Sequence, residues 1–499
     1  MSNPAIGATP ALPARPVLDS IFGDLWPDEQ AGARTSGRPR LLAAALGVGL
    51  LAAVVVPFRD PGLGSFIVLG AVGAVAAFAA RERFTATMLG SGALCLLLTA
   101  TVVVRDAEWI VALCLMATFA VGSAALTDGR SVNGLVASAA AVPLAAVRGL
   151  PWLGRSLTVS GRPATWWPVV RTIAVSALLV LVFGALFASA DALFARWVGV
   201  LVPDLTFGSM FFRLFVLAAV SGLTATGVYV ALAPPRVERL ALPAARTVRR
   251  FEWLVPVGLL TATFAVFLVA QLTALFGGHG YIRRTTGLTY ADYVHQGFGQ
   301  LTLATVLTLA VVATAVRHAP RDTGTDRLLL QAMLGLLCLF ALVVVASALS
   351  RMHVYEQAYG FTRLRLLVSV FEGWLGVVVV LVLAAGVTLR GHWVPRAALL
   401  TGATMLLALA ALNPDGYIAE QNVQRFEQTG RIDLAYLAGL SADAVPALQE
   451  LPSRFQECLF TAAPAEHDDW LELNVGRARA DAVAGGRRLA RYGGCVSPD

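Results

Sequence analysis

The sequence predicts an all-α fold, a polytopic transmembrane helical bundle followed by a small helical C-terminal tail domain. Hydrophobic residues make up 57% of the 499 residues and charged residues only 14%, whereas soluble domains carry about 25% charged residues. The apolar residues also form long blocks separated by short arginine-bearing loops, and about 20 apolar residues span a bilayer. Both observations favour a membrane protein over a large soluble enzyme.

The first 40 residues are polar and contain Ala, Pro and Gly, which predicts a mobile N-terminal tail. One amphipathic stretch within it, residues 18–26, is expected to lie on the membrane surface or to dock a partner. The first apolar run begins at Leu41 and no small-residue cleavage site follows it, so we expect a transmembrane helix there rather than a signal peptide.

Eleven apolar blocks are long enough to be spans. They are residues 41–57, 63–80, 86–104, 109–127, 169–188, 211–233, 253–276, 298–316, 328–350, 366–388 and 396–412. A twelfth candidate, 132–147, is short, mostly alanine, and contains Asn133, Gly134 and Pro143. Its status decides the number of spans and the side on which every later loop lies.

The distribution of arginine favours eleven spans. All the basic residues are arginine, a composition that suggests a GC-rich bacterial genome. If 132–147 does not cross and the N-terminus is cytoplasmic, inner loops hold 20 arginines and outer loops 8. If 132–147 crosses, the split becomes 13 to 15. The positive-inside rule therefore predicts a multi-pass protein of the bacterial plasma membrane with an extracytoplasmic C-terminus, 132–147 being interfacial or re-entrant.

This topology predicts three regions: a cytoplasmic tail (1–40), a transmembrane domain (41–412) and a helical extracytoplasmic tail (413–499). Asn413 can cap a helix that has Pro414 at its first position, and a second helix is expected after Ser441. Cys458 and Cys495 would lie outside the cytoplasm, where a disulfide can persist. The remaining three cysteines, Cys95, Cys114 and Cys338, lie in apolar spans and are expected to be packing residues.

The predicted outer face gathers most of the tyrosines, histidines and loop carboxylates, so a functional site is expected to open there. The candidate residues are Asp191, Tyr290, Asp292, Tyr293, His295, Arg351, His353, Tyr355, Glu356, Tyr359, Arg363, Arg365, Glu372, Asn413, Asp415, Asn422 and Arg425. Glu372 is the strongest of them, because ionisable residues inside a span are functional candidates by default. Arg365 lies seven residues earlier on about the same helix face, so a salt bridge is the alternative.

Three runs within these outer segments, TYADYVHQGF, LSRMHVYEQAYGFTRLRL and LNPDGYIAEQNVQRF, resemble a bacterial integral membrane family designated domain of unknown function 4173, with a close relative numbered 4153. The resemblance covers the chain from the first span to about residue 450. It implies a multi-span membrane protein and supplies no established activity, so no catalytic residue is carried over.

The outer residues also allow two kinds of chemistry other than transport. His295 and His353 with Asp292 and Glu356 could form an external metal or acid–base site, but no diagnostic ligand spacing is present, so no metal or cofactor is expected. Asp191, Asp292 and Glu356 could supply the carboxylate base of a transferase acting on a lipid-linked substrate. They could equally pair with Arg196, Arg363 and Arg365 and hold loops together. No phosphate-binding loop or nucleophile motif is visible.

Three classes of function therefore stay open. A permease-like or envelope-associated role is favoured, with the lipid bilayer and an envelope substrate or membrane protein as partners. The alternatives are a membrane enzyme acting on a lipid-linked or envelope substrate at the outer face, and a non-catalytic sensor or assembly partner. Nucleic acid is not an expected partner, because no compact basic recognition helix is present.

Overall fold

The computed structural model describes residues 25–26, 38–80, 85–150, 152–153, 207–241, 246–286, 298–462 and 469–490, with five isolated helical positions between 175 and 187. Within these residues, nine helices are long and apolar enough to cross a membrane. Strand occurs there as one short antiparallel pair. The prediction of an all-α polytopic bundle is thus confirmed.

The long apolar helices are α4 (Leu63–Ala80), α5 (Ala86–Val104), α6 (Glu108–Thr127), α11 (Phe207–Leu232), α12 (Arg250–Thr286), α14 (Phe298–His318), α15 (Gly324–Tyr359), α16 (Arg363–Thr388) and α17 (Val394–Ala411). Two shorter apolar helices are α3 (Pro39–Val55) and α7 (Val132–Arg148), which contains Pro143. Ten predicted spans coincide with these helices, and the span 169–188 lies almost wholly outside the described residues. That α7 does not cross stays a prediction.

By contacts, the chain divides into two compact units. The first comprises Met1–Val54, Val72–Arg83 and Ser138–Arg239. Inside it, Gly49 of α3 packs so closely on α11 that a Cβ there would meet Ser221. The Arg213 guanidinium of α11 donates to the Ala53 carbonyl at the end of α3 (2.8 Å). Trp26, from the predicted amphipathic stretch, is buried and donates to the Ala233 carbonyl (2.9 Å).

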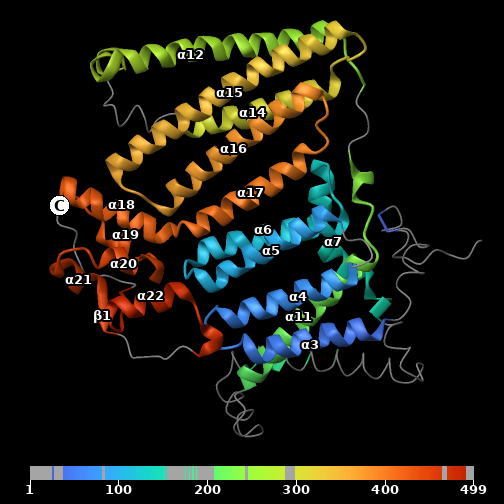
Figure 1. The fold of residues 1–499 in the computed structure, drawn as a ribbon, viewed down its shortest axis with the longest axis vertical. Helices are drawn as coiled ribbons and strands as arrows, with labels where there is room; N and C mark the ends of the chain where they lie inside the picture. Colours follow the sequence, from blue (N-terminus) through green and yellow to red (C-terminus); the bar gives the residue numbers. More distant parts are fainter. Residues whose placement is uncertain are drawn as a thin grey trace, which may run out of the picture. The chain divides into compact units, whose positions relative to one another are not determined.

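The second unit comprises Val55–Ala71, Phe84–Ala137 and Leu240–Asp499. Helices α12, α14, α15 and α16 share one apolar core, which includes Leu337 and Val379. Helices α5, α6 and α17 share another around Leu98 and Ile110. In α15 a capping box joins Thr323 and Asp326, and Asp326 also pairs with Arg250 of α12. These helices lie side by side in Figure 1.

A small domain follows α17. Its elements are α18 (Pro414–Thr429), α19 (Leu434–Ala438), η3 (Ala442–Ala444), α20 (Val445–Leu448), α21 (Ser453–Leu459), β1 (Phe460–Ala462), η4 (Trp470–Glu472), α22 (Val475–Ala484) and β2 (Arg487–Leu489). Strands β1 and β2 pair antiparallel, with Phe460 opposite Leu489. This tail domain has its own apolar core, formed by Ile418, Leu437, Leu448 and Leu459 among others.

Two local predictions for the tail have different outcomes. Asn413 caps α18 as expected: its side chain accepts from the Gly416 N–H, and Pro414 is at the first helical position. Helical structure does begin after Ser441, but it is divided into the 3-10 turn η3 and the four-residue α20. Its apolar residues Val445 and Leu448, with the following Leu451, are all buried.

The tail domain lies at the end of the second unit's helices where α5 turns into α6 and α15 into α16 (Figure 1). We call this the tail-side end of the bundle. Its loops are residues 105–107 and 360–362, and the N-terminus of α4 belongs to the same end because the Leu63 N–H donates to the Leu473 carbonyl (3.1 Å). The contacts at this end contain most of the described candidate residues.

Candidate functional site

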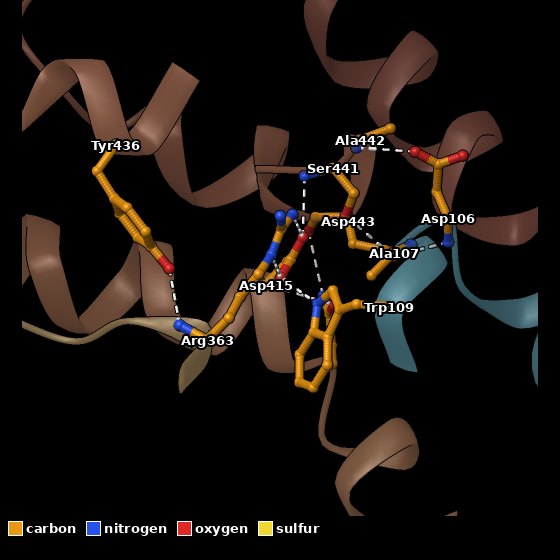
Figure 2. A network of polar contacts seen from close by, with 11 residues as sticks. Asp106, Ala107, Trp109, Arg363, Asp415, Tyr436, Ser441, Ala442 and Asp443 are labelled. Carbon is orange, nitrogen blue, oxygen red and sulfur yellow. Dashed lines mark hydrogen bonds and ion pairs between the residues drawn. The ribbon is translucent and has the colours of Figure 1, made fainter. Parts of the chain in front are cut away.

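The first contact joins the start of α16 to the start of α18. Arg363 begins α16 after the Thr362 cap, and its guanidinium reaches the Asp415 carboxylate through both Nε (2.9 Å) and Nη2 (2.5 Å). The Trp109 indole of α6 donates to Asp415 Oδ1 (3.0 Å) and the Ser441 N–H to Oδ2 (2.9 Å). Asp415 is completely buried, and its contacts join α18 to the start of α16, to α6 and to the segment at Ser441 (Figure 2).

The ionisation of Asp415 follows from these partners. Burial alone would raise the pKa of its carboxyl, but the hydrogen bonds and charge of Arg363, with the donors of Ser441 and Trp109, hold the pKa below its ordinary value. The Arg363 backbone N–H donates in turn to the Tyr436 hydroxyl (2.7 Å). The group is thus a satisfied, ionised pair, an arrangement suited to holding two elements together.

A second contact joins the tail to the α5–α6 loop. Asp443 Oδ2 accepts from the N–H groups of Asp106 (2.7 Å) and Ala107 (2.9 Å), and Asp106 Oδ2 accepts from the Ala442 N–H (3.0 Å). Figure 2 shows this reciprocal pairing. Burial raises the pKa of Asp443, partly offset by the two backbone donors and the charge of Arg105. Its Oδ1 is buried and accepts no hydrogen bond from the described residues.

Helix ends around this loop are capped across long sequence distances. Arg105 donates to the carbonyls of Ala410 (2.6 Å) and Ala411 (2.7 Å) at the end of α17. Asn474 of the tail donates to the carbonyls of Val102 (3.0 Å) and Arg105 (2.9 Å) at the end of α5. These donors satisfy C-terminal carbonyls that a helix leaves unpaired.

A third contact covers the α15–α16 turn. Asn422 of α18 accepts from the Phe361 N–H (3.1 Å) and donates to the Phe361 carbonyl (2.9 Å). Arg425 donates to the carbonyls of Gln357 (3.2 Å) and Ala358 (2.7 Å). Asn422 and Arg425 of α18 thus hold the turn, whereas Ile418 of the same helix enters the tail core.

Several other candidates lie on the last turns of α15. The outer segment predicted from residue 351 onward is helical as far as Tyr359. Tyr355 and Tyr359 are in ring contact (4.9 Å between centroids), and Arg365 lies over the Tyr355 ring (4.4 Å). His353 Nε2 is 2.9 Å from Gln357 Nε2 on the same helix, and Glu356 is buried. Glu356 is thus enclosed, whereas His353, Gln357 and Tyr359 are exposed.

A separate polar group lies deeper, among the apolar helices. The Arg351 guanidinium and the Ser347 hydroxyl of α15 both donate to Gln271 Oε1 of α12 (2.8 and 3.4 Å). Glu372 of α16 is fully buried, and neither of its carboxyl oxygens accepts a hydrogen bond within the described part of the chain. The Thr302 hydroxyl of α14 faces it, but donates to the Phe298 carbonyl (3.3 Å). We call Gln271, Thr302, Ser347, Arg351 and Glu372 the bundle polar layer.

The alternative of an Arg365–Glu372 salt bridge is wrong. Arg365 is in the first turn of α16 and its guanidinium turns back to the carbonyls of Tyr359 and Gly360. Those carbonyls lie at the end of α15. They accept the Arg365 N–H groups that a salt bridge would have directed to Glu372. Among the described residues, Glu372 therefore has no ion-pair partner, and the Thr302 hydroxyl is the polar group that faces it.

The remaining candidates cannot be placed. Asp191, Tyr290, Asp292, Tyr293, His295 and Cys495 lie outside the described residues. Cys458 is disulfide-bonded, whereas Cys95, Cys114 and Cys338 are free; its pairing with Cys495 stays a prediction. Across the described ranges, no group of three His, Cys, Asp or Glu side chains is arranged to hold a metal ion.

Sequence reasoning missed the α5–α6 side of the site: Arg105, Asp106, Trp109, Asp443 and Asn474. The available signal was the short loop 105–109, RDAEW, in which two acidic residues and a tryptophan stand between two long apolar blocks. Nothing in that loop indicates its partners, which lie more than 300 residues further along the chain.

Comparison with known proteins gives a family and no activity. A family model described as "Domain of unknown function (DUF4153)" matches residues 92–451, from within α5 into the tail domain. No curated protein and no solved structure matches the chain. The family numbered 4173, which the three sequence runs resemble, is not confirmed. Because the match covers well over half of the chain, this protein with its long apolar helices belongs to the DUF4153 family.

Proposed function

We propose that this membrane protein is permease-like and handles a small substrate within its helix bundle at the bundle polar layer. The observation that carries the proposal is Glu372, a buried carboxyl without a hydrogen bond on an apolar helix. Ionisable groups at such positions are costly and mark substrate or ion pathways. A stabilising role would require a partner, and none of the described residues provides one.

At the tail-side end, Asp106, Asp415 and Asp443 are engaged in structural contacts. A general base at this surface would need a carboxylate free to accept a proton from substrate. Asp415 is ion-paired and fully buried, and Asp443 and Asp106 are engaged with backbone donors. Arg363, Asn413, Asn422 and Arg425 are likewise used to hold the tail on the helices. These residues support a structural role for this end.

The proposed setting is the bacterial plasma membrane, with the tail-side end outside the cytoplasm and the tail domain among envelope components. The support is the arginine bias of the opposite loops. The described contacts are consistent with the grouping of loops that this topology requires. Asp128 and Arg396, assigned to the same inner side, form an ion pair (3.0 Å), and the Val248 N–H donates to the His318 carbonyl (3.0 Å).

The test is uptake by proteoliposomes containing the full-length protein. The panel consists of radiolabelled sugars, amino acids, short peptides and their phosphorylated forms. We expect at least one solute to accumulate in wild-type liposomes and to fail to accumulate with Glu372→Gln, while Glu420→Gln, an exposed change on α18, behaves as wild type. No accumulation of any member by folded wild-type protein would overturn the proposal.

A further inference from the structure

The position of Glu372 within α16 is well defined by its neighbours. The buried residues of that helix, Glu372, Leu375, Gly376 and Val379, recur at helical spacing and form one stripe. Val379 belongs to the apolar core shared with α12, α14 and α15. Gly376 packs on α15 so that a Cβ there would lie 3.1 Å from Val345. Glu372 therefore continues an apolar contact face toward the tail-side end.

Its depth follows from the helix geometry. Glu372 is nine residues beyond Arg363, which is about 13 Å along an α-helix. Since α15 and α16 are joined by a short turn and run antiparallel, the Gly376–Val345 contact places Glu372 level with residues 348–350 of α15. Arg351 and Ser347 thus lie at about the same level, and the carboxyl is well inside the apolar part of the bundle.

The charged groups on the surrounding helices are engaged elsewhere. On α16 itself, Arg365 donates to its own preceding turn. On α15, Arg351 donates to Gln271. The charged residues of α14 and α17, and those of the described side chains of α12, lie toward the opposite end of the bundle: Arg250, Glu252, Arg317, His318 and Arg396. No described cation is therefore placed to compensate an ionised Glu372.

An isolated carboxylate in such surroundings is strongly disfavoured, because burying a charge without a partner costs far more than burying the neutral acid. A sodium or potassium ion could supply the charge, but it would need several further oxygen ligands. Of the described residues, the Thr302 hydroxyl is the one oxygen that faces the carboxyl, which is too few for such an ion. A proton requires no such set of ligands, and it is the cation that this environment fits.

We infer that Glu372 is a proton-binding site: its carboxyl is the neutral acid in this structure and loses the proton when the bundle opens to water. In that step the carboxyl O–H bond breaks, the electron pair stays on the carboxylate, and the proton passes to an entering water molecule. The inference rests on the proposed function in one respect, since a permease opens its interior to water. If Glu372 binds and releases a proton in this way, the proton is the ion that is coupled to substrate movement.

The direct test is infrared spectroscopy of the full-length protein in liposomes at pH 7. A neutral carboxylic acid has a carbonyl band separate from the carboxylate bands. We expect an acid band in wild type, the loss of its Glu372 component in Glu372→Gln, and a shift of that component in Glu372→Asp, which keeps a carboxyl. Glu356→Gln controls for the other buried glutamate. Asp415→Asn should remove carboxylate bands and no acid band.

Two results would overturn the inference. One is a wild-type spectrum from which Glu372→Gln removes only carboxylate bands, meaning that Glu372 is ionised. The other is loss of the wild-type acid band when choline is replaced by sodium at constant pH, meaning that the site takes a metal cation. The Glu372→Asp variant keeps the assignment valid if the glutamine variant does not fold.

Failure of the inference and failure of the proposed function are distinguishable. If the protein takes up a solute but Glu372 is ionised, the proposed permease function stands and the proton site is refuted. If Glu372 is neutral but the protein takes up no member of the panel, the proton site stands and the proposed function is refuted.

Discussion

The Arg363 guanidinium and the Asp415 carboxylate form a two-point ion pair, 2.9 and 2.5 Å, across 52 residues of sequence. Asp415 is fully buried, and the Arg363 side chain is about one-third exposed. The pair joins the first turn of α16 to the first turn of α18. Removing one member of a buried ion pair leaves the other charge uncompensated, which makes this contact sensitive to single substitution.

Asp415→Ala is expected to lower the free energy of unfolding by about 3–5 kcal/mol. Loss of the carboxylate strands the Arg363 charge and removes the acceptor for Trp109 and Ser441. Thermal unfolding of the purified protein in detergent measures the change, and limited proteolysis reports loosening of the tail. Glu420→Ala, an exposed change on the same helix, should stay within about 0.5 kcal/mol of wild type. Equal melting temperatures for the two variants would refute the role of the pair.

Asn413 offers a second test because it combines a cap with an unusual backbone. Its φ is +57°, a left-handed conformation that most side chains adopt at a cost. Its side chain also accepts from Gly416 and donates to the Asp443 carbonyl (3.1 Å). Asn413→Gly loses only the side-chain bonds, whereas Asn413→Ala adds strain of about 1–2 kcal/mol. The alanine variant should therefore melt lower than the glycine variant, and the reverse order would contradict the assignment.

The tail contact should also depend on pH through Asp443. Burial raises the pKa of this carboxyl above its ordinary value of 3.8, so the folded state binds the proton more tightly than the unfolded state. The contribution to stability is therefore full below that ordinary value and declines as pH rises through the raised one. Asp415 acts in the opposite sense: its lowered pKa removes stability as pH falls below 3.8.

Asp443→Asn isolates the first effect. The amide oxygen can still accept from the Asp106 and Ala107 N–H groups, but it carries no charge. We expect the variant to be more stable than wild type at pH 8, with the difference shrinking toward pH 4. Melting temperatures measured across that range decide it, and a variant that is less stable than wild type at pH 8 would contradict the account of Asp443.

The proposed sidedness predicts which introduced cysteines are labelled in whole cells. Tyr359→Cys on the tail-side end and His392→Cys between α16 and α17 are both exposed positions. An impermeant thiol reagent should label the first and spare the second until the cells are opened. Labelling of His392→Cys alone would invert the topology and direct the tail domain to the cytoplasm.

The long apolar blocks made the helices readable from sequence, because a span is specified by its own length and composition. Ten of eleven predicted spans coincide with described helices, although α12 and α15 run beyond their predicted ends, to Thr286 and Tyr359. Polar residues such as His353 and Gln357 continue α15 because the tail packs on that end, where Arg425 takes its last carbonyls. The hydropathy of a segment carries no information about whether a distant domain packs on its end.

The contacts of the site residues were likewise predictable from the sequence only where they are local. The Asn413 cap is a contact within four residues and was predictable from local chemistry. The pairing of Asp106 with Ala442 and Asp443 spans more than 330 residues, and only the tertiary fold brings those groups together. The Arg365–Glu372 alternative failed because spacing on one helix does not reveal that a competing set of carbonyls lies closer to the arginine.

The proposed function requires the bundle polar layer to be a working site that opens to water. Cysteines at Ser347 and Thr302, two members of that layer, test it directly in membranes with a small water-soluble methanethiosulfonate. Native Cys338, buried in the apolar core of the same helix as Ser347, is the matched control. The account predicts that both introduced cysteines react while Cys338 does not. If neither introduced cysteine reacts while Tyr359→Cys reacts normally, the layer is part of a closed structural core, which would contradict a site that opens to water.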